Sequence, residues 1–479
     1  MNDLKPGQRP VVTVLGAGPA GIAAAFALTR DGRADVTVLE RAERAGGNSS
    51  SFQIDGIWCD YGSHRFHPVA EPQVLQDVKD LLGSDLLLQP RHGRIRLGGA
   101  WIHFPLKPAD ALLKLPKAFA LSLMADMAMK PFRKKATGPA TFSSVLYDGL
   151  GKTISESFYF PYVRKLWGLP PEKLAVTLAE RRVSSGSVGK ILAKMMRMLP
   201  GMGSPTTGKF FYPKQGFGQI SAAMAAKATE QGARFRLGTE VTRIERDGDH
   251  VNAVWIREGT AEKRHESAMV LSTIPLTTLV RLIDPPAPPE VQEAAKAIRF
   301  RGMILLYLIL KTDRFTEYDA HYFPELSIPI SRMSEPKNYN SATGPKGKTI
   351  LCAELPCDPG DPWWAMSDAE LGAHFCTWLG ELGLPVTVPV DRCETRRLSH
   401  AYPVYDLEFQ ARFDRIDHWL LGLKGLLNFG RQGLFAHDNT HHAFAMSYGA
   451  VDSMNDDGSI DDAKWAAHRV EFASHRVED

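Results

Sequence analysis

The first residues that could do chemistry form one run near the N-terminus, Gly16-Ala17-Gly18-Pro19-Ala20-Gly21. Gly16 permits a tight turn, Gly18 lets the backbone come close to a pyrophosphate, and Gly21 allows a helix to pack closely. Glu40 follows 19 residues after Gly21, where its carboxylate can accept hydrogen bonds from the hydroxyls of a ribose. This spacing predicts a dinucleotide site. A chance cluster of glycines would leave Glu40 unexplained.

A strand, a helix and a second strand are expected to position these residues. Residues 11–15 are a continuous apolar run, typical of a strand buried on both faces of a parallel sheet. Helix-forming residues follow from Ile22, and residues 36–39 predict the second strand, which ends at Glu40. The helix would direct unpaired N–H groups and the positive end of its dipole toward the phosphates.

A second pair of glycines, at 46 and 47, follows in a stretch where a site for NAD has no need of one. The longer FAD needs backbone close to its ribityl chain and phosphates. The run from Val11 to Pro68 resembles the flavin-binding start of the amine oxidase and protoporphyrinogen oxidase superfamily, whose pattern Glu-Arg-x-x-x-x-Gly-Gly it contains. The resemblance implies that FAD is held by Gly16, Gly18, Pro19, Ala20, Gly21, Glu40, Arg41, Gly46, Gly47 and Asn48.

The stretch from Tyr61 to Pro68 contains Gly-x-His-x-Phe-His, which is similar to a segment of UDP-galactopyranose mutase. In the superfamily this stretch passes near the flavin ring. The resemblance therefore implies that Gly62, Ser63 and His64 contact the cofactor. We expect His64 to act in catalysis, because histidine offers hydrogen bonds and titrates near neutral pH, and we expect His67 to be structural.

A second strong signal lies near the C-terminus, where Gly430-Arg431-Gln432-Gly433 resembles the closing Gly-Arg-x-Gly motif of the superfamily. Arg431 is expected to counter phosphate charge or to cover the flavin, and it is the second predicted catalytic residue. A helix predicted from Ala443 would point N–H groups at the flavin, so Asn439 and His441 are also predicted to bind the cofactor. The nearby histidines match no metal-ligand spacing, and we expect no metal site.

The resemblance also implies contacts in the middle of the chain. The backbone at Val241 matches a position that contacts the adenine. An aromatic stretch from Phe158 to Leu169 is expected to face the substrate. Predicted substrate-binding residues are Tyr159, Tyr162, Trp167 and Arg332, the last of which could pair with an acidic group of the substrate.

The expected fold class is α/β, with a Rossmann-like FAD-binding domain and a discontinuous α+β substrate-binding domain. The FAD-binding domain would comprise residues 10–68, 205–284 and 420–455. The substrate-binding domain would comprise residues 69–204 and 285–419. Residues 456–479 are expected to form a C-terminal tail or a surface helix.

Composition excludes several classes of protein. The formal net charge of +3 is too small for a dedicated nucleic-acid binder. Five scattered cysteines predict neither a disulfide framework nor a zinc site, and they fit a reducing cytoplasm. The Leu-, Ala- and Met-rich segment 111–135 has two interpretations. It is either a helix packed on the substrate domain, interrupted near Pro116, or an amphipathic helix resting on a membrane surface.

Three functions are compatible with these features. The first is an FAD-dependent oxidoreductase, an oxidase or dehydrogenase, that transfers a hydride from a small organic substrate to flavin. The second is a non-redox flavin-dependent mutase of sugar nucleotides, resembling UDP-galactopyranose mutase. The third is a flavin-binding scaffold without turnover. The mutase is the second choice because no arginine pair in the sequence can be matched to the one that would hold a diphosphate.

Overall fold

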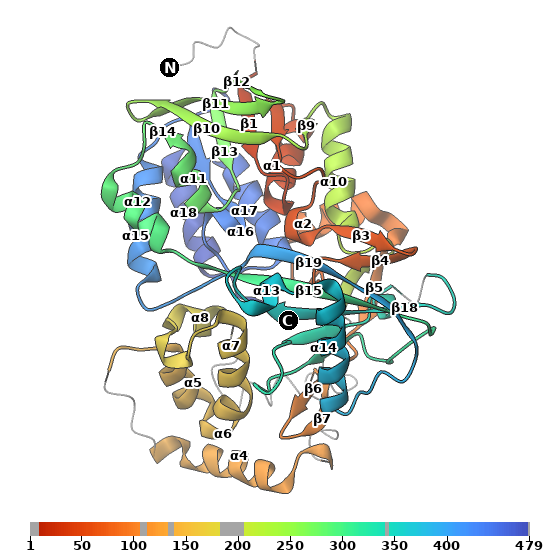
Figure 1. Ribbon diagram of the computed structural model, residues 1–479. Coiled ribbons are helices and arrows are strands. Elements are labelled where there is room, and N and C mark those ends of the chain that lie inside the picture. The colour runs from red at the N-terminus through yellow and green to blue at the C-terminus, as the bar shows by residue number, and fades with distance from the viewer. Residues whose placement is uncertain (1–8, 106–112, 133–137, 183–205, 341–343, 478–479) are drawn as a thin grey trace.

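The computed structural model describes residues 9–105, 113–132, 138–182, 206–340 and 344–477. Figure 1 shows two halves, one built on a parallel sheet with helices and the other on a mixed sheet with a helical bundle below it. No described helix has both the length and the apolar character that crossing a membrane requires.

The first half is built on a five-stranded parallel sheet with strand order β20-β13-β1-β2-β9. Its strands are β1 (Val11–Leu15), β2 (Asp35–Leu39), β9 (Arg234–Arg236), β13 (Met269–Ser272) and β20 (Leu426–Asn428). One face packs against α1 (Pro19–Arg30), α10 (Gln219–Glu230) and α17 (Thr440–Asp452). The sequence predicted β1, α1 and β2, and the structure confirms them.

The other face of the parallel sheet packs against a small sheet and several helices, through a core that includes Leu15, Val270 and Ile244. The strands are β10 (Glu240–Asp247), β11 (His250–Glu258), β12 (Ala261–Glu266) and β14 (Ile283–Asp284). The helices are α11 (Leu276–Leu282), α12 (Pro289–Ala297) and α15 (Phe409–Leu421). Both faces of the parallel sheet are therefore covered, which explains why its strands are apolar throughout.

The second half is built on a seven-stranded mixed sheet with order β19-β15-β18-β17-β16-β6-β7. Its strands are β6 (Gly93–Leu97), β7 (Ala100–Phe104), β15 (Phe300–Leu310), β16 (Ala320–Tyr322), β17 (Arg332–Ser334), β18 (Thr349–Pro356) and β19 (Val390–Pro403). The helix α14 (Asp368–Glu381) packs on one face. The hairpin of β3 (Ser51–Ile54) and β4 (Ile57–Asp60) packs on the other.

A helical bundle lies beside the mixed sheet and includes α4 (Lys117–Met129), which begins directly after Pro116. Its other members are α5 (Phe142–Leu150), α6 (Lys152–Ile154), a π-helical turn at Ser155–Tyr159, α7 (Phe160–Trp167) and α8 (Val176–Arg182). The remaining named elements of the two halves are α2 (Pro72–Leu82), β5 (Leu86–Pro90), β8 (Lys209–Pro213), α13 (Pro362–Ala365), α16 (Gly430–Gly433) and α18 (Asp462–Ala473).

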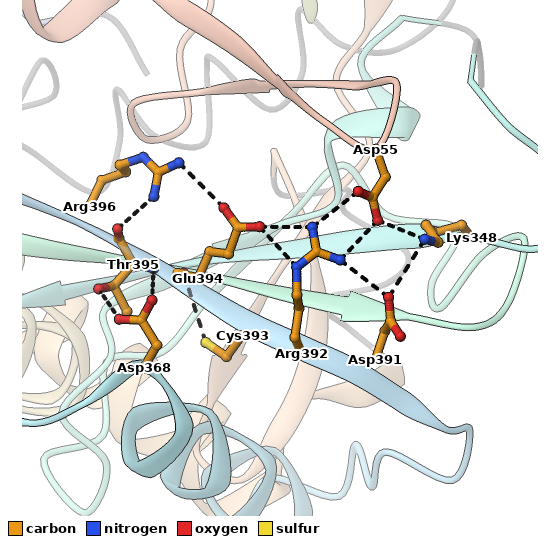
Figure 2. A network of polar contacts seen from close by, with 9 residues as sticks. All are labelled: Asp55, Lys348, Asp368, Asp391, Arg392, Cys393, Glu394, Thr395 and Arg396. Carbon is orange, nitrogen blue, oxygen red and sulfur yellow. Dashed lines mark hydrogen bonds and ion pairs between the residues drawn. The ribbon is translucent and has the colours of Figure 1, made fainter.

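Two packing contacts concern segments at the boundary of the predicted domains. The helix α2, assigned from the sequence to the substrate-binding part, packs against α10 and α17 of the parallel-sheet half. Figure 2 shows the other contact, on the mixed-sheet half, in which Asp55 in the turn between β3 and β4 binds Arg392 and Lys348. This contact fixes the start of β19, whose far end reaches the candidate site.

Candidate flavin and substrate site

The glycine run lies at the carboxyl end of β1, where Gly16 N–H donates to the Leu39 carbonyl over 2.8 Å. The Glu40 carboxylate accepts the Ala17 N–H through one oxygen and the Ala42 N–H through the other, each over 2.8 Å. Glu40 therefore faces the glycine loop, at the strand end that a ribose-binding carboxylate requires.

The second glycine pair lies directly on the first loop. The Gly46 N–H donates to the Ala17 carbonyl over 2.7 Å. A Cβ placed on Gly47 would lie 3.1 Å from the Gly18 Cα, so a side chain there would press on the loop that is predicted to hold phosphates. Arg44 donates to the Gly47 carbonyl over 2.9 Å and fixes this approach. The two glycine-rich loops thus form one backbone-lined cradle.

The N-terminus of α17 closes the same region. The Ser49 and Thr440 hydroxyls lie 3.2 Å apart, and the Asn439 N–H donates to His442 Nδ1 over 3.3 Å. The sequence predicted a helix from Ala443, whereas α17 begins at Thr440. Its unpaired N–H groups are brought to the second glycine loop, where they favour negative charge.

Arg431 is buried beside this helix end and donates to the Ala401 carbonyl over 2.8 Å. Its guanidinium also lies 5.6 Å from the centre of the Tyr402 ring. Burial lowers the pKa of Arg431 from its ordinary value. Its Nε and the Nδ1 of His441 are buried polar atoms that lack a hydrogen-bond partner within the described structure. Such atoms fit a site that a polar cofactor completes.

His64 is held by backbone on the opposite side of the cradle. Its Nε2 lies 3.0 Å from the Asn48 carbonyl and 3.1 Å from the Tyr61 carbonyl, so Nε2 carries the proton and donates. Its ring stacks on Phe217, with 5.1 Å between centroids. Burial lowers the pKa of His64, which favours the neutral ring. His64 thus joins two loops, and its catalytic role remains a prediction.

Arg332, which is predicted to bind substrate, is connected to this region by Glu354, a residue that was not predicted from the sequence. The Ser63 N–H donates to Glu354 Oε1 over 2.9 Å, and Arg332 Nη2 donates to the same oxygen over 2.6 Å. Burial by itself lowers the pKa of Arg332, but the Glu354 carboxylate outweighs it and holds that pKa above its ordinary value. Glu354 therefore connects the loop at Ser63, which is predicted to contact the flavin, with the arginine that is predicted to bind substrate.

Phenol rings surround Arg332. Its guanidinium lies 5.9 Å from the centre of the Tyr322 ring, and its charge acts on the predicted Tyr162 and on Tyr402. Burial raises the pKa of Tyr162, so its hydroxyl stays protonated. A second buried arginine, Arg65, donates to Asp319 over 3.2 Å. This part of the site combines two arginines, each paired with a buried carboxylate, with aromatic rings and hydroxyl donors.

Trp167 belongs to an adjoining aromatic wall. Its Nε1 donates to the Pro403 carbonyl over 3.0 Å, and its ring lies 5.5 Å from His437 and 6.1 Å from Tyr402. Tyr402 thereby contacts both Trp167 and Arg431. The ring of Tyr159 lies 4.9 Å from the ring of Phe158.

The remaining predicted cofactor residues lie at the edges of the cradle. Thr239 N–H donates to the Glu40 carbonyl over 2.8 Å, which places the start of β10, and so Val241, beside the end of β2. Arg41 is exposed, and its charge acts on His400. Burial is the larger cause of the lowered pKa of His400.

A histidine cluster lies behind α17. Asp438, His442 and His475 bring potential metal-ligand atoms within 4.8 Å of one another. The sequence predicts no metal here, because His475 lies 33 positions beyond His442 and outside any local ligand spacing. The rings of His442 and His475 stack 4.2 Å apart, and Arg181 lies 3.3 Å from Asp438. Parallel rings direct their lone pairs past a shared ion, and Arg181 already supplies positive charge, so the cluster has the geometry of an ion-pair network.

The fold and these contacts define a two-part protein in which a parallel sheet with glycine-rich loops meets a buried polar site on a mixed sheet. The chain belongs to the family of flavin containing amine oxidoreductases, whose family model matches residues 19–405. The superfamily predicted from the glycine motifs and the α/β fold class are thereby confirmed. Membership implies a flavin cofactor, and the two glycine loops and the unpartnered atoms of Arg431 and His441 fit one.

Individual relatives agree with the family. A protein of Mycobacterium tuberculosis named as a flavin-containing monoamine oxidase is 28% identical over 302 residues, which are 59% of this chain and 61% of that protein. The match thus spans about three fifths of that relative's length.

Solved structures share the fold. A reduced UDP-galactopyranose mutase superposes with a TM-score of 0.81 at 20% identity, covering 98% of each chain. A protein named as a protoporphyrinogen oxidase from Exiguobacterium sp. 255-15 gives 0.70 at 18% identity, covering 93% of this chain and 98% of that one. At these identities the likeness concerns the fold alone.

Proposed function

We propose that the protein is an FAD-dependent oxidoreductase acting on a small organic substrate that carries an acidic group. The observation that carries this proposal is Glu354, which accepts hydrogen bonds from Ser63 on the flavin-side loop and from Arg332 on β17. One buried carboxylate therefore couples the cofactor side of the site to its cationic side.

The dinucleotide form of the flavin is supported by the length of the cradle. The loop at Gly16–Gly21 with Glu40 suits a phosphate and an adenosine ribose. The loop at Gly46–Asn48 and the N-terminus of α17 suit the second phosphate and the ring half. When bound, FAD would accept a hydride from the substrate, which also loses a proton, and would pass two electrons to dioxygen or another acceptor.

The chain's own residues would orient the substrate and exclude water. Arg332 would hold the acidic group, since a guanidinium can bind a carboxylate or phosphate through two N–H groups. Tyr162 and Tyr402 stay protonated because burial raises the pKa of each, so they can donate hydrogen bonds. Their rings and Trp167 would cover the apolar part of the substrate.

The test has two parts. The purified full chain is denatured, and the released cofactor is identified by mass. FAD is expected, and release of FMN would contradict the dinucleotide part. The holoprotein is then mixed without oxygen with a panel of organic acids and acidic amines, each beside its uncharged ester. We expect acids to bleach the flavin absorbance and esters to do so weakly.

Matched variants sharpen the second part. Arg332→Lys should raise KM for the acidic substrate roughly tenfold or more, with a smaller change in kcat, because a lysine loses the two-point contact. Arg392→Lys changes an exposed arginine of the network in Figure 2 and should leave both constants unchanged. If turnover of a sugar nucleotide required prior reduction by dithionite and consumed no reductant, the mutase alternative would replace the oxidoreductase.

A further inference from the structure

The segment Leu113–Phe132, which contains α4, has an exposed apolar surface. Figure 1 shows α4 along the lower edge of the molecule, below α6 and far from the parallel sheet. Leu121 and Met124, one turn apart, are 66% and 65% exposed. The large apolar side chains exposed in this segment are Leu113, Leu121, Met124, Met127, Met129 and Phe132. Contiguous exposure of this kind marks an interaction surface.

The polar contacts of α4 fix which face points outward. Asp126 accepts the Thr153 N–H over 2.6 Å, and Lys130 donates to the Gly149 carbonyl over 3.1 Å. Both contacts face α5 and α6. Since side chains three and four positions apart share a face of a helix, Leu121 and Met124 are turned away from the protein.

The inner face of α4 packs near the candidate site. Phe119 joins a cluster that includes Ile102, Tyr322 and Tyr162. Tyr322 and Tyr162 are the rings that surround Arg332. The inner face of α4 and the rings beside Arg332 therefore share one apolar cluster.

Charge identifies the kind of partner. The segment contains the bases Lys114, Lys117 and Lys130, and its one acid is Asp126, which is bound to Thr153. We propose that the outward face of α4 docks on an anionic phospholipid surface, with Leu121 and Met124 among the acyl chains and the exposed Lys117 among the headgroups. Exposed apolar side chains flanked by lysines bind anionic interfaces through apolar burial together with attraction to the headgroups.

A second copy of the chain fits this face less well. A two-fold interface would place the α4 surface against itself. The bases of one copy would then meet the bases of the other, with no exposed acid from the segment to offset them, and like charges across an interface oppose association. Anionic lipid supplies the missing charge.

The experiment is co-sedimentation of the full-length holoprotein with vesicles of phosphatidylcholine alone or with added phosphatidylglycerol. We expect binding to the anionic vesicles that weakens as salt is raised, and weak binding to phosphatidylcholine. The double variant Leu121→Asp with Met124→Asp should lower the partition coefficient roughly tenfold or more. Flavin content and the unfolding midpoint should stay unchanged, since both side chains are exposed.

A matched control has the same added charge elsewhere. Leu421→Asp with Val470→Asp replaces apolar side chains that are 52% and 75% exposed on other helices and should bind vesicles as the parent does. Equal binding by both double variants would overturn the proposal. So would the lack of vesicle binding by the parent, or a dimer seen in light scattering that only the α4 variant dissociates.

Discussion

Replacing Gly430 with alanine tests how closely the C-terminal motif packs on α1, the helix that is predicted to bind phosphate. Gly430 lies at the start of α16 with a φ of +79°, a conformation that alanine adopts at a cost of about 1–2 kcal/mol. Its added Cβ would also lie 2.7 Å from the Ala20 Cβ in the first turn of α1. Real Cβ atoms do not come this close, so α16 or α1 must move. Overpacking of this kind costs a further 1–3 kcal/mol or so.

A second glycine serves as a control that separates the backbone cost from the overpacking cost. Gly383 has a φ of +74° and no atom within 4 Å of an added Cβ. Gly383→Ala should therefore show the backbone cost alone, about 1–2 kcal/mol. Gly430→Ala should cost about 2–5 kcal/mol, the sum of both costs. It should also lose flavin, because Ala20 belongs to the loop that is predicted to hold phosphate.

The assay is urea unfolding followed by circular dichroism, with flavin content taken from the ratio of visible to ultraviolet absorbance. Introducing Ala20→Gly removes the second methyl group, so Gly430→Ala should cost about 1–3 kcal/mol less in that background. If Gly430→Ala cost the same in both backgrounds and kept its flavin, the close contact between α16 and α1 would be refuted.

Two further outcomes follow from buried charge. Arg332→Met should lower the free energy of unfolding in urea by about 3–5 kcal/mol, because it leaves the Glu354 carboxylate buried without its ion-pair partner. Adding Glu354→Leu should recover part of that loss. A double variant less stable than Arg332→Met would contradict this reasoning. Burial alone would lower the pKa of His475, but Asp438 and Glu71 raise it to about 9. The ion pair of His475 therefore contributes fully to stability below about pH 6.5, and this contribution is lost as pH rises toward 9. His475→Gln should then lower the free energy of unfolding by about 3 kcal/mol at pH 6 and by almost nothing near pH 10. A loss of stability that does not depend on pH would exclude the ion pair.

Local patterns were sufficient to predict the elements of the proposed nucleotide-binding unit. The strand, the glycine turn, the helix and Glu40 lie within 30 residues, and each has its own physical signal in the sequence. The structure confirms β1, α1 and β2 and brings Glu40 to the glycine loop. The start of α17 was placed three residues late, because the histidines before Ala443 are weaker helix formers than alanine.

Glu354 could not be placed from local patterns, because its partner Ser63 is 291 positions away in the sequence. A signal was nevertheless present. Glu354 is one acid inside the apolar run Leu351–Leu355, and a charged residue in a buried strand needs a partner. The sequence also contains the partner, Arg332, but no local pattern indicates that Arg332 pairs with Glu354. Strand pairing between β17 and β18 supplies that reason, since Arg332 lies opposite Glu354.

The register of β17 on β18 therefore has a consequence for function. Cross-strand partners share one face of a sheet, so pairing Arg332 with Glu354 fixes both side chains toward the loop at Ser63. A one-residue shift of β17 would turn Arg332 to the opposite face, where Met333 and Ala353 belong to an apolar core. The packing that forbids this shift thus also holds the predicted substrate arginine in place. Specificity for an acidic substrate would then depend on the apolar face of the same two strands.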